Sequence, residues 1–141
     1  MIKVLIWPVV LYGCETWTLR RAEIDKLQAL EMWLWRRLER VSWRERISNE
    51  EVLTMVNETR CLIRTICQRK KNWIGHVLRG DGLLKDVLEG RMLGKKRQGR
   101  PRTGMIDELM EGSFEKMKRR AEGREVWREW VLKTCLRAEY L

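Results

Sequence analysis

Residues 94–102, GKKRQGRPR, contain five cations and no acidic residue in a run of nine. Lysine and arginine at this density neutralise the phosphates of a nucleic-acid backbone, and the release of counterions makes such binding depend on salt. The glycines allow close approach to a backbone, and Pro101 favours an extended conformation of the residue before it. This segment is therefore the first candidate for a nucleic-acid contact.

The segment also allows narrower and weaker interpretations. QGRPR is similar to the arginine-glycine-arginine-proline core that enters narrow A·T minor grooves, although Gln98 replaces the first arginine. The negative potential of a narrow groove would still attract Arg100. A solvated linker without a ligand remains open as well, and a nuclear-import role for residues 95–97 is compatible with each interpretation.

A second basic motif, RKKNWIGHVLRG, spans residues 69–80. Arg69, Lys70 and Lys71 occupy successive positions of a predicted helix, so we expect them to spread around it as a positive collar. Trp73 has the chemistry to stack on a base, but its helical spacing with Ile66 favours a place in the core. The collar is therefore the expected contact.

Charge is concentrated around these two motifs. The net charge of +10 is the sum of +2 in residues 1–68, +8 in residues 69–102 and zero in residues 103–141. A focused basic segment indicates a polyanionic partner more strongly than a diffuse one. The cations expected to contact nucleic acid are Arg69, Lys70, Lys71, Arg79, Arg91, Lys95, Lys96, Arg97, Arg100 and Arg102.

No pattern in the sequence indicates catalysis, a metal or a cofactor. His76 is the only histidine, and a general base there would need Asp81 or Glu89 as a partner, so we expect a structural histidine. The apolar run from Val4 to Tyr12 is shorter than the ~20 residues that span a bilayer. We expect free thiols in a reducing compartment, nuclear or cytoplasmic, because no pair has CxxC spacing among Cys14, Cys61, Cys67 and Cys135.

Apolar spacing predicts helices along most of the chain. Steps of three and four from Ile24 to Val41 indicate a helix of about twenty residues, and Thr18 is a plausible N-cap. Ser48 and Glu51 fit a capping box that begins a short helix. We expect the tryptophans to pack between helices, and those on or beside apolar faces are Trp17, Trp33, Trp35, Trp43, Trp127 and Trp130.

The second half predicts one long helix, an irregular segment and a final pair of helices. The long helix covers residues 59–80, with Gly80 as its stop and close packing or a break at Gly75. Residues 80–104 are rich in glycine and lack a helical period, and Ser113 is a candidate cap for a later helix. The sequence therefore predicts an all-α protein, a small bundle of four to six helices with one basic, glycine-rich irregular segment.

Five further groupings of residues follow one another along the chain: LYGCETWTL (11–19), VSWRERISNEEVL (41–53), RKKNWIGHVLRGDG (69–82), GKKRQGRPR (94–102) and AEGREVWREWV (121–131). Taken in this order, the five segments resemble the carboxy-terminal end of the endonuclease–reverse transcriptase of non-long-terminal-repeat (non-LTR) retrotransposons. The resemblance covers roughly residues 3–133.

The resemblance implies a thumb-like helical region at residues 1–79, a basic loop at 80–104 and a helical hairpin at 105–141. In the family the first segment follows the polymerase palm, whose paired aspartates hold magnesium. Here the four aspartates stand singly, at positions 25, 81, 86 and 107. We expect the endonuclease domain of the family to be absent as well. We therefore expect no enzyme activity from this chain. We expect it to be a fragment, whose partner in the parent protein is the missing polymerase body.

The function implied is non-specific binding of RNA or an RNA–DNA duplex during target-primed reverse transcription. Two alternatives remain open: a helical module that binds a protein partner, and a transposon relic without a selected function. An enzyme that uses His76 is the remaining class, and we expect no such activity.

Overall fold

A computed structural model describes residues 2–90, 104–107, 109–110 and 112–137. For residues 136 and 137 it describes the backbone but not the side chains. Every regular element in these ranges is helical, which confirms the predicted all-α bundle, although more and shorter helices form than the four to six expected. The elements are α1 (Ile2–Leu5), α2 (Trp7–Val10), the 3-10 helix η1 (Cys14–Thr16), α3 (Arg21–Leu38), the 3-10 helix η2 (Trp43–Glu45), α4 (Asn49–Met55), α5 (Leu62–Arg79), α6 (Leu83–Glu89), α7 (Phe114–Glu122) and α8 (Arg124–Arg137).

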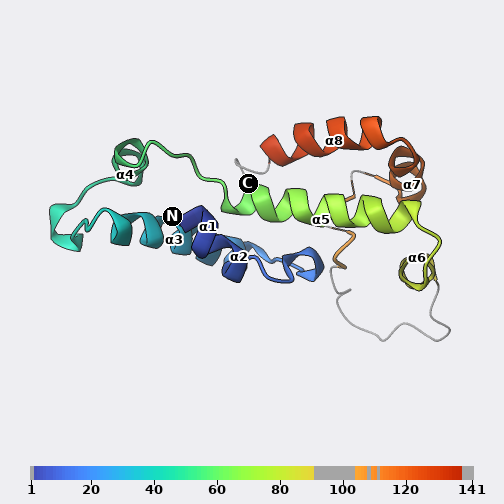
Figure 1. The fold of residues 1–141 in the computed structure, drawn as a ribbon, viewed down its shortest axis with the longest axis horizontal. Coiled ribbons are helices and arrows are strands. Elements are labelled where there is room, and N and C mark those ends of the chain that lie inside the picture. The colour runs from blue at the N-terminus through green and yellow to red at the C-terminus, as the bar shows by residue number, and fades with distance from the viewer. Residues whose placement is uncertain (1, 91–103, 108, 111, 138–141) are drawn as a thin grey trace.

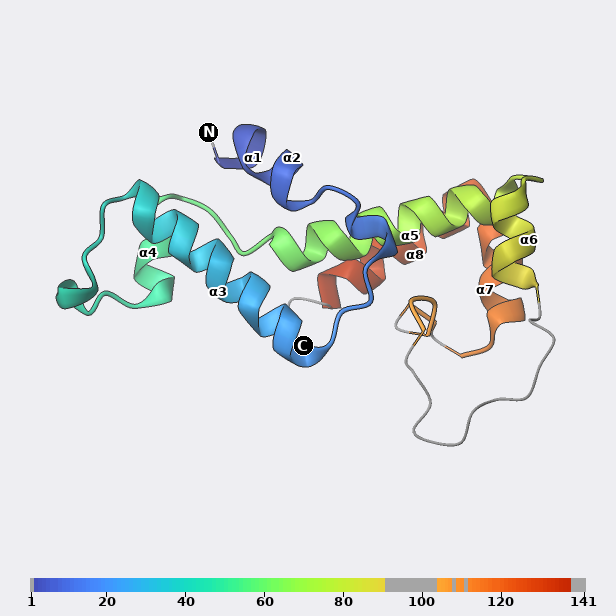
Figure 2. The ribbon, with the colours of Figure 1, turned by 90° about the horizontal axis from the view of Figure 1, so that it is seen from below.

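Helix α5 is the central element of the bundle. Residues of the first half of α5 belong to a hydrophobic cluster with residues of α1, α2, η1, α3 and α4, and residues of its second half belong to another with residues of α7 and α8. Figure 1 shows α5 between α3 and α8. Helix α8 runs back along α5, and the two views agree that they lie side by side (Figure 2). The two halves of α5 therefore belong to two separate hydrophobic clusters.

Several helix ends follow the sequence signals. Ser48 caps α4: its hydroxyl accepts from the Glu51 backbone N–H at 3.2 Å, and the Glu51 carboxylate accepts from the Ser48 N–H at 2.7 Å. The Ser113 hydroxyl accepts from the N–H of Lys116 at the start of α7, and Gly80 ends α5. These three predictions are confirmed, because capping depends on residues close in sequence.

Two local predictions are wrong. Thr18 is not the N-cap of α3, which begins at Arg21; Arg20 is the cap, and its backbone N–H donates to the Glu23 carboxylate. Within the segment expected to be irregular, Leu83–Glu89 form α6. The carboxylate of Glu89 lies 2.8 Å from the Lys118 ammonium, and this tertiary contact joins α6 to α7.

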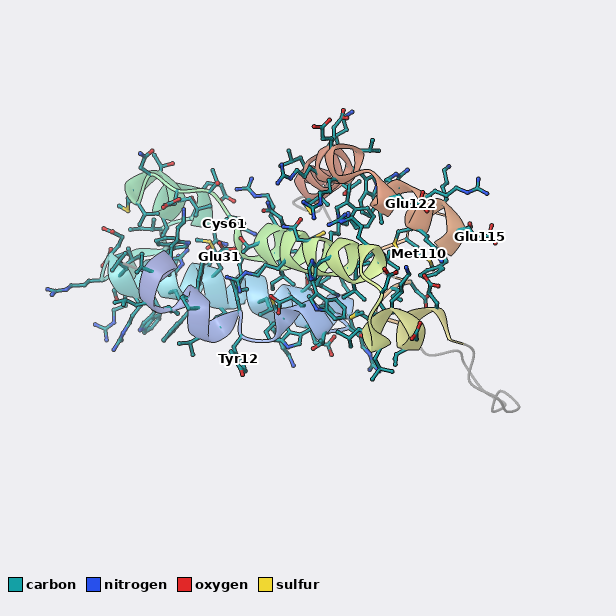
Figure 3. The ribbon with its side chains drawn as sticks, turned by 45° about the vertical axis from the view of Figure 1, so that its right-hand side comes forward. Tyr12, Glu31, Cys61, Met110, Glu115 and Glu122 are labelled. Atoms are coloured by element: carbon teal, nitrogen blue, oxygen red, sulfur yellow. The ribbon has the colours of Figure 1, made fainter. Side chains whose placement is uncertain are left out.

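The amino-terminal cluster contains a buried carboxylate. The side chain of Glu31 on α3 points towards the start of α5 (Figure 3), where it accepts from the backbone N–H of Cys61 at 2.8 Å and of Leu62 at 3.2 Å. First-turn N–H groups have no partner within their own helix, and the positive end of the helix dipole favours an anion there. Glu31 therefore caps α5 from another helix.

The carboxy-terminal cluster depends on a close approach between α5 and α8. Trp127 is buried, and its indole N–H donates to the Lys71 carbonyl at 3.1 Å. A Cβ built on Gly75 would lie 2.6 Å from Cε2 of Trp127, closer than packed atoms come. Of the two alternatives predicted at Gly75, close packing or a break, the structure shows close packing, and glycine is there because the indole ring occupies the space of a side chain.

Candidate nucleic-acid interface

The cations predicted to contact nucleic acid divide into two groups. Six of them lie outside the described residues, so their contact with nucleic acid stays a prediction: Arg91, Lys95, Lys96, Arg97, Arg100 and Arg102. The other four lie on α5, where the structure assigns each a position. The motif GKKRQGRPR also lies outside the described residues.

The predicted positive collar on α5 is wrong in two of its three residues, because Lys70 and Lys71 are buried. The ammonium of Lys71 lies 4.3 Å from the centre of the Trp130 ring and donates to the hydroxyl of Thr134 on α8. The aromatic face stabilises the cation. Spacing along one helix shows that the three cations spread around it, but it does not show that packing buries two of them.

Arg69 and Arg79 remain at the surface, and each also holds a turn of the chain. Arg69 donates to the Leu11 carbonyl at 3.5 Å, and Arg79 donates to the Ala121 carbonyl at 3.0 Å, near the end of α7. Partial burial and two nearby cations lower the pKa of Arg79 below its ordinary value; these cations are Arg124 and Arg128. Arg79, Arg124 and Arg128 therefore place three positive charges at one end of the bundle.

The histidine and its candidate carboxylates do not form a catalytic group. His76 is exposed on α5. Asp81 is 3.3 Å from Lys85, and Glu89 is 2.8 Å from Lys118, so each carboxylate has an ammonium partner. Over the residues that the structure describes, no three Cys, His, Asp or Glu side chains gather closely enough to hold a metal ion.

An open groove of about 950 Å³ lies beside the end of α3, at the left of Figure 1. Two tryptophans stand at its edges with much of their surface open to solvent: Trp33 is 57% exposed and Trp43 is 85% exposed. This corrects the expectation that both pack between helices. We call this feature the Trp–Arg groove; its lining contains no acidic residue and consists of Trp33, Arg36, Arg37, Arg40, Val41, Ser42, Trp43, Arg46 and Ile47.

Short-range contacts shape the Trp–Arg groove. Arg36 on α3 donates to the Ile47 carbonyl at 2.7 Å and to the Asn49 amide oxygen at 3.0 Å, which holds the returning chain against α3. The Ser42 N–H donates to the Glu45 carboxylate at 3.2 Å, and this contact closes η2 beneath Trp43. The end of α3 and the chain that returns past Ile47 and Asn49 are therefore held together on the two sides of the groove.

Two arginines of the groove have left-handed backbone conformations, with φ of 56° at Arg40 and 50° at Arg46. This region costs a residue with a Cβ roughly 1–2 kcal/mol, and glycine would avoid the cost. Strained positions of this kind cluster at binding and catalytic sites. The chain nevertheless has a long cationic side chain at both positions, which lie either side of Trp43.

The Trp–Arg groove combines the two groups that bind single-stranded nucleic acid. Exposed indole rings offer faces on which unpaired bases stack, and guanidinium groups bind the phosphates between them. Within the chain, the Trp43 ring already has one cation–π contact, with the guanidinium of Arg44 5.7 Å from its centre.

The sequence contained a signal for this groove, a local cluster of arginines. The cluster is hidden when the net charge is summed over a long segment. Residues 36–46 hold five arginines and two glutamates, a net of +3, inside a segment of 68 residues whose net charge is only +2. A window of about ten residues would have revealed the cluster. The exposure of Trp33 has no such signal, because it depends on which face of α3 the other helices cover.

Comparisons of the chain with protein-family models, with curated proteins and with solved structures find no match. In the described ranges, no helix has the length and apolar content needed to cross a membrane.

Proposed function

We propose that this chain is the nucleic-acid-binding carboxy-terminal portion of a non-LTR retrotransposon reverse transcriptase. It binds RNA or an RNA–DNA duplex without sequence preference and carries neither the polymerase nor the endonuclease site. The single observation that supports binding best is the Trp–Arg groove, where two exposed tryptophans stand among four arginines. The resemblance of the five sequence segments supports the choice of family.

The groove suits an unpaired stretch of the nucleic acid. In a duplex the base faces are stacked on one another, so an indole ring reaches them only where a strand is open or ends. The remaining cations suit a phosphate backbone in either form, since they act by charge. Among them are Arg69 and the exposed Arg124 and Arg128, together with the predicted contacts of residues 91–102.

Fluorescence anisotropy with labelled oligonucleotides tests the proposal. We expect strands of unrelated sequence to bind with similar affinity, and an RNA–DNA hybrid to bind more weakly than single-stranded RNA because its bases are paired. The logarithm of each affinity should fall linearly with the logarithm of salt concentration. Replacing Lys95, Lys96, Arg97, Arg100 and Arg102 by alanine weakens binding to every sequence alike and flattens this slope. A chain that binds none of these ligands at low salt contradicts the proposal.

The same variant separates the basic loop from the Trp–Arg groove. If the alanine variant binds as tightly as the wild-type chain at low salt, residues 95–102 are not a contact. A variant with substitutions in the groove then becomes the deciding measurement.

One observation favours a second function, a helical module that binds a protein. Apolar side chains on α1, α2 and the turn after them are open to solvent, with Val4 73%, Val9 75% and Tyr12 86% exposed. Tyr12 points away from the bundle (Figure 3). A protein partner that stays bound after nuclease treatment, and is lost from a Val4→Ser/Val9→Ser variant, would favour this function.

A further inference from the structure

Two cysteines far apart in the sequence meet between α5 and α8. The sulfurs of Cys67 and Cys135 lie 3.3 Å apart, and the Cys135 thiol donates a hydrogen bond to Cys67. Both thiols are free. Cys67 is half-buried and Cys135 is 3% exposed, so a small molecule in solvent reaches Cys67 first. Neither the helical pattern nor nucleic-acid binding explains why two thiols face each other there.

We propose that Cys67 and Cys135 form a peroxide-oxidised thiol pair, in which Cys67 reacts with the oxidant and Cys135 then closes a disulfide. The geometry supports both steps. One thiol is open to solvent, the other is in contact with it, and redox-sensing cysteines in proteins are often arranged beside a resolving cysteine in this way.

The surroundings of Cys67 favour its thiolate, which is the reactive form. The hydrogen bond from Cys135, together with the cations Lys71 and Lys70, lowers the pKa of Cys67 to about 7, although burial opposes this shift. The same contact raises the pKa of Cys135, and burial adds to the rise; Lys71 and Arg64 oppose it. At neutral pH about half of the pairs therefore hold one thiolate, on Cys67, and one thiol, on Cys135.

The buried position of Lys71 fits this arrangement. Its ammonium contacts neutral groups on α8, the Thr134 hydroxyl and the Trp130 ring, one turn of α5 away from Cys67. A cation in this partly desolvated place stabilises a thiolate more strongly than a cation in water does. Lys71, which the sequence suggested as a phosphate contact, is thus placed where it acts on a sulfur.

The reaction balances with hydrogen peroxide as the oxidant. The Cys67 thiolate attacks one peroxide oxygen; an S–O bond forms, the O–O bond breaks, and the departing hydroxide takes up a proton to leave as water. The Cys135 sulfur then attacks the Cys67 sulfenic acid, the S–O bond breaks, and the hydroxide leaves as water with the proton of Cys135. Two electrons pass from the two sulfurs to the peroxide.

The other two cysteines are internal controls. Cys14 is 0% exposed and Cys61 is 8% exposed, and burial raises the pKa of both thiols. The proposal therefore expects peroxide to leave Cys14 and Cys61 reduced while it oxidises the pair.

The experiment treats the purified, reduced 141-residue chain with hydrogen peroxide, blocks the remaining thiols and maps the peptides by mass spectrometry. The expected product is an intramolecular disulfide between Cys67 and Cys135, reversed by dithiothreitol. In a Cys135→Ser chain, dimedone should trap a sulfenic acid on Cys67. Oxidation that begins at Cys14 or Cys61, or disulfides that form only between chains, would overturn the proposal.

The rate at which Cys67 reacts with peroxide provides a second readout. It is measured on the wild-type chain and so does not depend on whether a variant folds. A thiol whose pKa is about 7 has roughly 50 times more thiolate at pH 7 than one at the ordinary value of 9.0, but its lower basicity reduces its nucleophilicity about eightfold. The native chain should therefore react at Cys67 about sixfold faster than the same chain in denaturant. Equal rates would contradict the arrangement of the pair.

Discussion

The indole ring of Trp127 lies against the backbone of Gly75, so that α8 approaches α5 more closely than any side chain at position 75 would allow. The indole N–H completes the contact by donating to the Lys71 carbonyl one turn earlier, at 3.1 Å. This single approach brings three further residues of α8 to α5, namely Trp130, Thr134 and Cys135.

A Gly75→Ala substitution should therefore destabilise the protein. Alanine improves helix propensity by ~1 kcal/mol, but forcing a methyl group into a filled core costs about 1–3 kcal/mol, so the expected net loss is up to about 2 kcal/mol. Urea unfolding followed by circular dichroism measures this loss. Gly82→Ala is the matched control, because a Cβ there meets nothing within 4 Å, and an equal loss in both variants would refute the argument.

The buried carboxylate of Glu31 should be one of the largest polar contributions to stability. Glu31→Ala leaves the Cys61 and Leu62 N–H groups unsatisfied, and each such buried group costs about 1–3 kcal/mol. The expected loss in the free energy of unfolding is roughly 2–6 kcal/mol. Glu50→Ala, at an exposed position of α4, should change it by less than about 0.5 kcal/mol. Similar values for the two variants would show that Glu31 does not cap α5.

The tryptophans of the Trp–Arg groove should affect binding without affecting stability. Base stacking contributes about 1–3 kcal/mol per base, so Trp33→Ala and Trp43→Ala should each weaken binding of single-stranded RNA by roughly 5- to 100-fold. Their exposure predicts an unchanged melting temperature. Leu83→Ala removes another exposed apolar side chain, 77% exposed and outside the groove, and should leave the anisotropy titration unchanged.

The strained arginines allow a charge test that avoids destabilisation. In the double variant Arg40→Gly/Arg46→Gly, glycine adopts the positive φ freely, and this relief offsets the greater entropy of the unfolded chain. The folded protein should stay within about 1 kcal/mol of the wild type, while the salt slope of RNA binding falls by about 1.4–1.8 for two lost phosphate contacts.

A control for that variant removes two exposed cations elsewhere, in Lys26→Ala/Lys116→Ala. If only long-range charge mattered, the salt slope of RNA binding would fall by the same amount in the two double variants. A slope that falls only in the groove variant would locate the phosphates at Arg40 and Arg46.

Alkylation of Cys67 should depend on pH as its lowered pKa requires. The rate of reaction with iodoacetamide follows the thiolate, so its midpoint should lie near pH 7 rather than 9, and the rate should fall below pH 7 as the thiolate takes up a proton. Cys135→Ser keeps a hydroxyl donor and should keep a low midpoint. Cys135→Ala removes the donor and should raise it. If the midpoint is equal in both variants, the lowered pKa of Cys67 comes from Lys70 and Lys71 and not from the hydrogen bond that residue 135 donates.

The sequence by itself determined the local structure of this protein. Helical class, the caps at Ser48 and Ser113 and the end of α5 at Gly80 were all predicted, because each depends on residues within a few positions or on the helical repeat. The surplus of charge in residues 69–102 was also visible without a structure.

Only the tertiary structure decided which side chains are open to solvent. The same helical spacing describes Lys71, which α8 buries, and Trp33, which stays 57% exposed. The meeting of Cys67 with Cys135 and the capping of Leu62 by Glu31 join residues 68 and 31 positions apart. Such pairs are set by the packing of whole helices, and no pattern of period 3.6 along the chain contains that information.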